Sequence, residues 1–376
     1  MVYALPATIC FLLRVRFLVL SHADRIGHLS IEPDCYVKEG RLGLRKKILG
    51  IFLVPPKTAA NKVLLRLWAE ELPFITSGFW CRMLVPLARI RWASHPISDY
   101  AVAINQTALC PSIQAKWKGR APLLSLSPDL LLQGRKSLVQ LGLPADAWYV
   151  CVHSREAGYS PSDEHLHSYR NSDIDHYVLA MRSIVERGGW CIRVGEPTSK
   201  PILPMKGVID YAHSPVRSES MDVFLCASCK FFLGNSSGLH LLSSVFGVSS
   251  ALANLVPIST SLPFFPGDIG IPKLLRRVDT GEALKFSEIL GSPVGNYRFS
   301  EQYVKDGIAV EENSPEDIRE LALEMLERRI GTPTYTPEDE FLQQRFRSLF
   351  REGHYSFGAD SRIGRDFLRK YANIID

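Results

Sequence analysis

Glycine and serine residues gather between two apolar segments of the chain, at Gly234, Asn235, Ser236, Ser237 and Gly238. Small residues let backbone N–H groups point outward at the start of a helix, where the helix dipole adds about half a positive charge, and two hydroxyls supply further donors. This combination is typical of a phosphate-binding loop. A plain turn with a serine helix cap would use the same residues. We favour the phosphate site, because a buried strand precedes the loop and ligands of parallel sheets bind at the carboxyl ends of strands.

A histidine and an arginine follow the strongest apolar run of the sequence. His153 and Arg155 stand at its end, and alternation in an extended segment turns both to the same side. A guanidinium there can hold a diphosphate through two parallel hydrogen bonds. The alternative for Arg155 is a salt bridge to Glu156 or to an acid of the next loop. We predict that Arg155 and the loop at Ser236 converge on the same pair of phosphate groups, with His153 beside them.

A second histidine, His28, ends the segment Asp24-Arg25-Ile26-Gly27-His28, directly after the first strand-like run. Histidine titrates near neutral pH, which suits a general base that removes a proton from a hydroxyl group. A structural histidine with satisfied hydrogen bonds is the alternative. Because it stands in a loop between a strand and a helix, we expect His28 to face a cleft and to act as a base.

Strands and helices alternate at short intervals through the second half of the chain. Apolar runs predict strands at 148–153, 190–194, 207–211, 231–233 and 250–253, and helical spacing predicts helices at 174–185, 221–226 and 239–246. These intervals are typical of right-handed βαβ units, which stack their strands into a parallel sheet.

The first half and the tail are less regular. We expect strands at 16–20 and 51–54, and helices at 59–72, 127–142, 314–330 and 366–372. The interpretation is an α/β protein with a domain at 1–145, a second at 146–330 and a helical tail at 331–376. Two sheet domains leave a cleft between them, where ligands often bind.

Composition narrows the functional classes. The chain has 376 residues, of which 46% are hydrophobic and 22% charged, which excludes a disordered or fibrous protein. Lysine and arginine number 44 against 39 acids, and no basic stripe with interleaved aromatics indicates a nucleic-acid partner. Eight cysteines lie mostly in apolar runs, as free thiols do in a reducing compartment. Cys226 and Cys229 lack a second ligand pair for zinc, so we expect buried thiols there.

The start of the sequence is apolar. Residues 1–13 carry no charge, and Arg14 and Arg16 follow. Thirteen residues are too few to span a bilayer, which needs about 20, and no positive charge precedes the stretch as in a signal peptide. The simpler interpretation is an element that leads into a buried strand, and a peripheral contact with a membrane is the alternative. We expect a cytoplasmic location, with that contact at the inner membrane as an option.

Several segments together resemble one group of known proteins. They are HSREAGY at 153–159, RNSDID at 170–175, GVIDYAH at 207–213 and MDVFLCASCKFFLGNSSG at 221–238, with DRIGHL at 24–29 and SRIGRDFL at 361–368. The chain is similar, over nearly its whole length, to uncharacterised bacterial glycosyltransferases found with surface-polysaccharide genes. More remotely, the HxR motif, an Asp-containing helix and the Ser-Ser loop resemble fucosyltransferases that use GDP-fucose. Those enzymes have the GT-B fold, in which two Rossmann-like domains face a cleft.

The resemblance implies roles for the predicted residues. Arg155 would grip the diphosphate of a nucleotide sugar, Ser236 and Ser237 would bind phosphate, Gly195 and Glu196 would contact the base or ribose, and Asp222 would lie near the donor. The C-terminal domain would then bind the nucleotide sugar, and the N-terminal domain the acceptor. Fucosyltransferases carry an acid three residues after the arginine of HxR, where this chain has Gly158, so the donor sugar stays open.

The implied reaction is a displacement at the anomeric carbon. A base, for which we predict His28, removes the proton of an acceptor hydroxyl while fixed donors stabilise charge on the leaving diphosphate. The acceptor would be a glycan or a lipid-linked glycan. We expect no cofactor besides the nucleotide sugar, with GDP as one option, and no metal. A sugar-nucleotide epimerase of the same architecture and a non-catalytic glycan- or nucleotide-binding protein are the alternatives.

Overall fold

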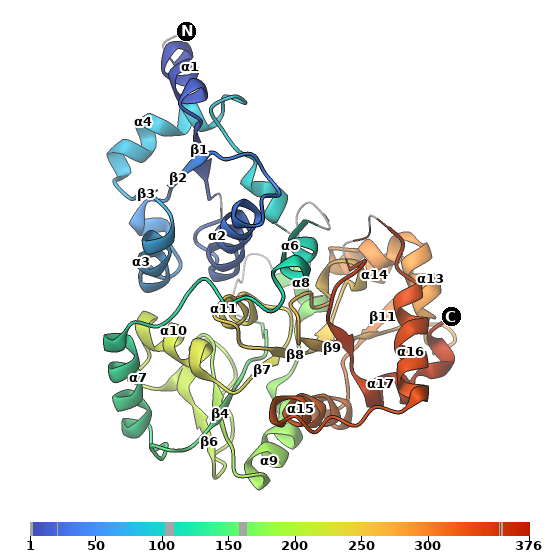
Figure 1. The fold of residues 1–376 in the computed structure, drawn as a ribbon. Coiled ribbons are helices and arrows are strands. Elements are labelled where there is room, and N and C mark those ends of the chain that lie inside the picture. The colour runs from blue at the N-terminus through green and yellow to red at the C-terminus, as the bar shows by residue number, and fades with distance from the viewer. Residues whose placement is uncertain (1–2, 21, 102–108, 158–163, 353, 355) are drawn as a thin grey trace.

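The protein contains two units, each built around a parallel sheet, with a pocket between them (Figure 1). The computed structural model describes residues 3–20, 22–101, 109–157, 164–352, 354 and 356–376. In Figure 1 the N-terminal unit, drawn in blue, lies above the rest of the chain.

The N-terminal unit has three parallel strands in the order β1-β2-β3. Its strands are β1 (Val15–Val19), β2 (Leu49–Leu53) and β3 (Phe74–Ile75), and its helices are α1 (Ala4–Leu12), α2 (Ile26–Arg41), α3 (Lys62–Glu71), α4 (Gly78–Ala88) and α6 (Leu109–Trp117). Helix α3 begins where the Asn61 side chain accepts a hydrogen bond from the Leu64 N–H (2.8 Å), and it buries Trp68 completely. A small separate core formed by Ala7, Phe17, Leu53, Cys81, Leu87 and Ala93 lies beneath α1 and α4.

The second unit has a seven-stranded sheet in the order β12-β9-β8-β7-β4-β5-β6, with every pair parallel. Its strands are β4 (Tyr149–Val152), β5 (Trp190–Arg193), β6 (Val208–Asp210), β7 (Phe232–Gly234), β8 (Ser250–Leu255), β9 (Ile269–Pro272) and β12 (Arg362–Ile363). All residues of β4, β7, β8 and β9 are buried, because helices cover both faces of the sheet.

The helices of this unit are α7 (Pro128–Gln140), α8 (Glu164–His167), α9 (Val178–Glu186), α10 (Glu219–Ser228), α11 (Gly238–Val245), α12 (Ile258–Ser261), α13 (Phe286–Gly291), α14 (Ser300–Lys305), α15 (Pro315–Ile330), α16 (Pro337–Ser348) and α17 (Arg365–Lys370). A separate antiparallel pair is formed by β10 (Leu274–Arg277) and β11 (Ile308–Glu311). Helix α15 packs against α9, and α7 packs against α10.

The direction in which the chain adds strands to the sheet reverses beside β4. The chain proceeds from β4 through β5 to β6 at one edge, then returns to β7 on the other side of β4 and continues through β8 to β9. Right-handed crossovers on opposite sides of such a reversal place their helices on opposite faces. The crevice outside the carboxyl ends of β4 and β7 is therefore the position where parallel α/β sheets bind ligands.

The predicted α/β class, with two parallel-sheet units that face a pocket, is confirmed. The predicted strands are present with ends displaced by a residue or two. The predicted helix at 59–72 begins only at Lys62, after a 3-10 turn at Pro56–Thr58. The tail at 331–376 is not only helical, because β12 adds an edge strand beside β9. The boundaries at 145 and 330 stay predictions.

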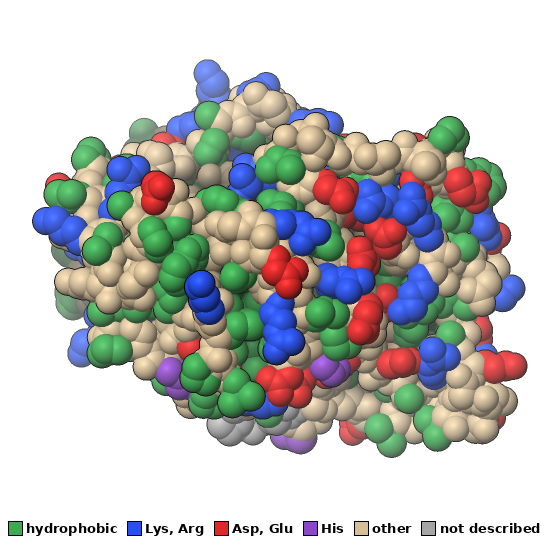
Figure 2. All heavy atoms as spheres, turned by 90° about the horizontal axis from the view of Figure 1, so that it is seen from below, with side chains coloured by type: hydrophobic (Ala, Val, Ile, Leu, Met, Phe, Trp, Pro, Cys, Tyr) green, Lys and Arg blue, Asp and Glu red, His purple; other side chains and the backbone are tan. Residues whose placement is uncertain are grey.

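The molecule differs between its two ends. Figure 2 shows the end opposite helix α1, where basic and acidic side chains are interspersed. No helix within the described part of the chain is both long and apolar enough to cross a membrane.

Candidate functional site

A pocket of about 700 Å³ lies between the two units, where the loops after β4 and β7 meet the start of α2. Most of the predicted site residues line it, namely His28, His153, Arg155, Gly195, Glu196, Asp222, Ser236, Ser237 and Gly238. A pocket of this volume is of the size that binds small molecules and cofactors. Its floor is the crevice at the reversal of the sheet.

The glycine–serine loop ends at the N-terminus of α11. The Ser237 N–H donates a hydrogen bond to His240 Nδ1 (3.2 Å). The first turn of α11 contains no acidic side chain. Ser237 and His240 form a capping box at the start of α11, as the serine-cap alternative expects, and the remaining N–H groups of the first turn can donate to a phosphate oxygen.

His153 is neutral at physiological pH. Its Nδ1 lies 3.0 Å from the Val194 carbonyl oxygen and must therefore donate a proton to it. Burial lowers the pKa of His153 to about 4, and the charges of Arg193 and Arg155 act in the same direction. The exposed ring nitrogen, Nε2, is then an acceptor. His153 can accept a hydrogen bond from a ligand hydroxyl, but it brings no positive charge to a phosphate.

Arg155 lines the pocket, but its guanidinium is bound within its own loop. It donates to the His167 carbonyl oxygen (3.3 Å) and to the Asn171 side chain. The backbone of Arg155 reaches the glycine–serine loop instead, because its N–H donates to Asn235 Oδ1 (3.0 Å). The two loops therefore meet, through Asn235 rather than through the guanidinium.

Arg170 is the guanidinium that contacts the loop, and the sequence analysis did not single it out. It donates to the Ser236 carbonyl oxygen (3.1 Å) and lines the pocket. Burial lowers its pKa, and the charge of Arg25 lowers it further. Among the residues that the structure describes, no carboxylate forms an ion pair with Arg170. A half-buried cation without a carboxylate partner among the described residues fits an anionic ligand.

Asn235 positions these residues rather than facing the pocket. Its side chain is 1% exposed, and its Nδ2 donates to the Arg170 carbonyl oxygen (3.3 Å) and to Ser172 Oγ (3.4 Å). Together with the bond from the Arg155 N–H, these contacts occupy the whole amide. Asn235 was predicted to bind the donor directly, and its contacts indicate instead that it holds the two arginine-bearing segments against the loop.

The N-terminal unit contributes a second helix start at the same place. A Cβ atom on Gly27 would lie 2.9 Å from the Gly238 Cα, so the backbones of α2 and α11 touch through two glycines. Neither helix carries an acid in its first turn. The positive ends of both helix dipoles therefore meet at the pocket.

His28 lies on α2 and forms a pair with Glu32. His28 Nδ1 and Glu32 Oε1 are 2.6 Å apart, and the Glu32 side chain is 4% exposed. A carboxylate at Nδ1 fixes the ring so that Nε2 can accept a proton, as a general base requires. Sequence analysis missed Glu32, although the four-residue spacing on a helix is a signal for such a pair.

Carboxylates line a different part of the pocket. Glu196 pairs with Arg217 (2.8 Å), whose Nε also donates to the Gly195 carbonyl oxygen. Asp222 accepts a hydrogen bond from the Tyr211 hydroxyl (2.8 Å), and burial raises its pKa. Carboxylates of this kind accept hydrogen bonds from sugar hydroxyls. The pocket thus offers donors and positive charge beside α11 and acceptors beside the loop after β5.

Two sequence features lie elsewhere. The expectation of no metal assumed that the sequence contains no Asp-x-Asp triplet, and that was wrong, because Asp173 and Asp175 form one. Both carboxylates pair with Lys200 outside the pocket. Gly158, the departure from the fucosyltransferase motif, lies outside the described residues. Cys226 and Cys229 are buried free thiols, as predicted.

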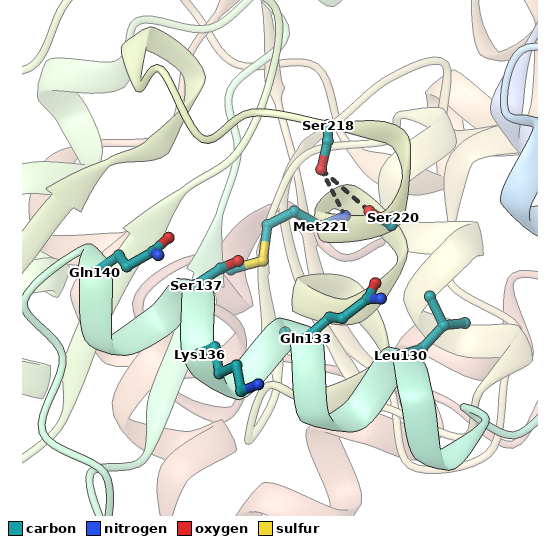
Figure 3. A pocket seen from close by; sticks show the side chains of 9 residues that line it. Leu130, Gln133, Lys136, Ser137, Gln140, Ser218, Ser220 and Met221 are labelled. Atoms are coloured by element: carbon teal, nitrogen blue, oxygen red, sulfur yellow. Dashed lines mark hydrogen bonds between the residues drawn. The ribbon is translucent and has the colours of Figure 1, made fainter.

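A smaller hollow of about 290 Å³ lies between α7 and the start of α10 (Figure 3). Figure 3 shows Gln133 and Gln140 extending from α7 toward the side where Ser218 and Ser220 lie. Its lining contains no acid and no histidine. We therefore assign the chemistry to the larger pocket.

Comparison with solved structures finds three matching chains, of which two are described here. One is ADP-heptose LPS heptosyltransferase II from E. coli, at 11% identity and a TM-score of 0.37, over 65% of this chain and 86% of that one. The other is a family 9 glycosyl transferase from Veillonella parvula, at 10% identity and a TM-score of 0.35, over 63% of this chain and 78% of that one. No protein-family model and no curated protein matches the sequence. The resemblance to the surface-polysaccharide group and to fucosyltransferases stays a prediction.

Proposed function

We propose that the protein is a glycosyltransferase that moves a sugar from a nucleotide diphosphate sugar to a hydroxyl group of a glycan acceptor. One observation carries the proposal. The N-termini of α2 and α11 meet beside the half-buried Arg170, at the crevice where the strand order of the sheet reverses. This concentration of donors and positive charge favours a diphosphate, and the pocket extends from it toward the carboxylates Glu196 and Asp222.

The proposed mechanism assigns one task to each group. The diphosphate would accept hydrogen bonds from Ser237, from the first N–H groups of α11 and from Arg170. The bond between the anomeric carbon and the phosphate oxygen breaks, and the acceptor oxygen forms the new bond to that carbon. The acceptor proton goes to Nε2 of His28, and Arg170 and the helix N-terminus stabilise the charge that gathers on the leaving diphosphate.

The nucleoside would occupy the part of the pocket near the loop after β5. His153 Nε2 and the Glu196 carboxylate are acceptors there, which suits ribose or sugar hydroxyls. The resemblance to the enzymes that use GDP-fucose makes GDP one option for the nucleotide. The acceptor would approach from the N-terminal unit, where His28 lies, and a lipid-linked glycan is the predicted form.

The first test is a binding panel. Isothermal titration and thermal unfolding with GDP, UDP, ADP, dTDP and inorganic pyrophosphate should reveal one preferred nucleotide, because a ligand at a hundred times its Kd stabilises the fold by about 2.7 kcal/mol. Binding of none of these compounds would refute the proposal. Binding of all with equal affinity would limit recognition to the diphosphate.

The second test separates a transferase from the alternative enzymes. Incubation with the preferred nucleotide sugar alone should leave it intact or hydrolyse it slowly, whereas an epimerase would change its sugar. Addition of glycan acceptors should release the nucleoside diphosphate in step with a mass increase of the acceptor. A protein that binds the nucleotide but gives neither product would be a binding module.

A further inference from the structure

Helix α1 exposes apolar side chains over most of its surface. Only Ala7 of its nine residues is buried, and it packs into the small core beneath α1 and α4. Leu5 and Leu12 are 71% and 72% exposed, and Leu13, which follows the helix, is 68% exposed. Burying one leucine contributes roughly 1.5–3 kcal/mol, so a surface that leaves several of them in water indicates a contact outside this chain.

Helix α4 continues the same surface. It exposes Phe79, Trp80 and Met83 (65%, 56% and 45%), and Trp92 lies 50% exposed after the helix. Both α1 and α4 pack on β1, over the same small core. Figure 1 shows both helices at the end of the N-terminal unit that is farthest from the second unit. The exposed apolar residues of α1 and α4, with Leu13 and Trp92, are called the apolar tip below.

The charged side chains that the structure describes in the two segments forming the apolar tip are basic. Arg14, Arg82, Arg89 and Arg91 are exposed there. Neither of the two segments that form the tip, 1–23 and 72–98, contains an aspartate or a glutamate. The end of the molecule shown in Figure 2 differs, because both signs of charge are interspersed on it.

We propose that the apolar tip docks the protein on a bilayer surface that contains anionic lipids. Leucine and phenylalanine would enter the boundary of the acyl chains, tryptophan would lie at headgroup depth, and the arginines would contact lipid phosphates. A helix of nine residues is about 14 Å long, which suits a helix that lies along the interface. This surface binding does not depend on the transferase reaction.

Charge favours a bilayer over a second copy of the chain. A symmetric dimer through the apolar tip would bring the same patch of each copy together and set arginines against arginines. An anionic leaflet instead supplies phosphates, and each basic residue near it increases the binding constant for the membrane roughly fivefold. Lipid is therefore the occupant that accounts for both the apolar and the basic residues.

The charge component is tested by sedimentation of the full chain with vesicles of phosphatidylcholine, with or without 30 mol% phosphatidylglycerol. We expect binding only with phosphatidylglycerol, and about a hundredfold weaker binding when Arg82, Arg89 and Arg91 are all replaced by glutamine, since three fivefold gains are lost. The matched control also removes three positive charges, by replacing the exposed Arg135, Lys136 and Lys206 with glutamine. Equal loss of binding in that control would overturn the proposal.

The apolar component needs a second variant. Replacing Leu5, Leu12 and Trp80 by serine should abolish binding even at low salt, while the same change at Leu203 and Val304, which are 83% and 76% exposed elsewhere, should leave it intact. Circular dichroism and nucleotide titration establish that each variant is folded, so a failure here is distinct from a failure of the proposed reaction. Absence of binding to phosphatidylglycerol vesicles, or a dimer in sedimentation velocity that the serine variant abolishes, would refute a lipid partner.

Discussion

Replacing Arg170 by glutamine should weaken nucleotide binding without destabilising the protein. Desolvation lowers the pKa of the guanidinium, and the guanidinium donates a hydrogen bond to the Ser236 carbonyl oxygen, which a glutamine amide can also make. Removing a half-buried cation that has no carboxylate partner among the described residues relieves a partial desolvation penalty. The free energy of unfolding should therefore stay within about 0.5 kcal/mol of the original value or rise.

The binding effect follows from the phosphate contacts that would be lost. Two charge-assisted hydrogen bonds at about 1.5 kcal/mol each give about 3 kcal/mol, which corresponds to a roughly 150-fold increase in Kd. Isothermal titration with the preferred nucleoside diphosphate measures this change, and urea unfolding measures stability on the same samples. The affinity for the nucleotide should fall, while the free energy of unfolding should rise or stay unchanged.

Arg193 provides the control. Its side chain is fully buried and pairs with Glu156 and with Asp210, each at 3.1 Å. Arg193→Gln leaves two carboxylates without their cation, which costs about 3–5 kcal/mol of stability, and nucleotide binding by the folded fraction should persist. If Arg170→Gln instead loses stability as Arg193→Gln does, or binds nucleotide with unchanged affinity, then Arg170 is a structural residue and the proposed diphosphate site is wrong.

Three further changes test other parts of the site. His28→Gln should lower the rate of transfer by a factor of about 10²–10⁴, and Glu32→Gln should lower it by less. The nucleotide Kd should stay unchanged in both variants, and a parallel loss of affinity would contradict the role of His28 as the base. Gly27→Ala should cost about 1–3 kcal/mol in urea unfolding, because its Cβ would meet the Gly238 backbone at 2.9 Å, whereas Gly291→Ala, with open space around it, should be nearly neutral. Burial lowers the pKa of His240 to about 4, so the unfolded chain takes up its proton from about pH 6.5 downward and the folded chain only near pH 4. Stability should thus fall by about 3 kcal/mol between these pH values through this group, and His240→Gln should flatten that slope in unfolding curves; an unchanged slope would refute the effect.

The sheet was predictable because its pattern is local. The run Tyr149–Val152 is apolar without alternation, which identifies a strand covered on both faces. The glycine–serine loop follows β7, another fully buried strand. The sequence could not predict contacts between segments that are far apart along the chain. Arg170 reaches a loop 66 residues farther along the chain, and β12 joins the sheet at its edge after the long helix α15. No periodicity encodes either contact.

The exposure of α1 was one of two outcomes that the sequence left open, for a related reason. Sequence alone suggested that the apolar start feeds a buried strand, and β1 does follow it. Hydrophobicity indicates that a segment prefers to be buried, but the amount of core available to cover it depends on the whole unit. The three-stranded sheet of the N-terminal unit is small, and beneath α1 it buries only Ala7.

The contact between Gly27 and Gly238 joins the fold to the proposed chemistry. Two positive helix ends, each equivalent to about half a charge, repel each other by roughly 1 kcal/mol at 5 Å and an effective dielectric constant near 20. Arg25 and Arg170 line the same pocket and add to that repulsion, and neither helix has an acid in its first turn. In a junction that only held two units together this arrangement would be a defect. A diphosphate between the helix ends would attract each of these positive groups and offset their mutual repulsion. Glycine at both positions lets the two helix starts come close enough to share it.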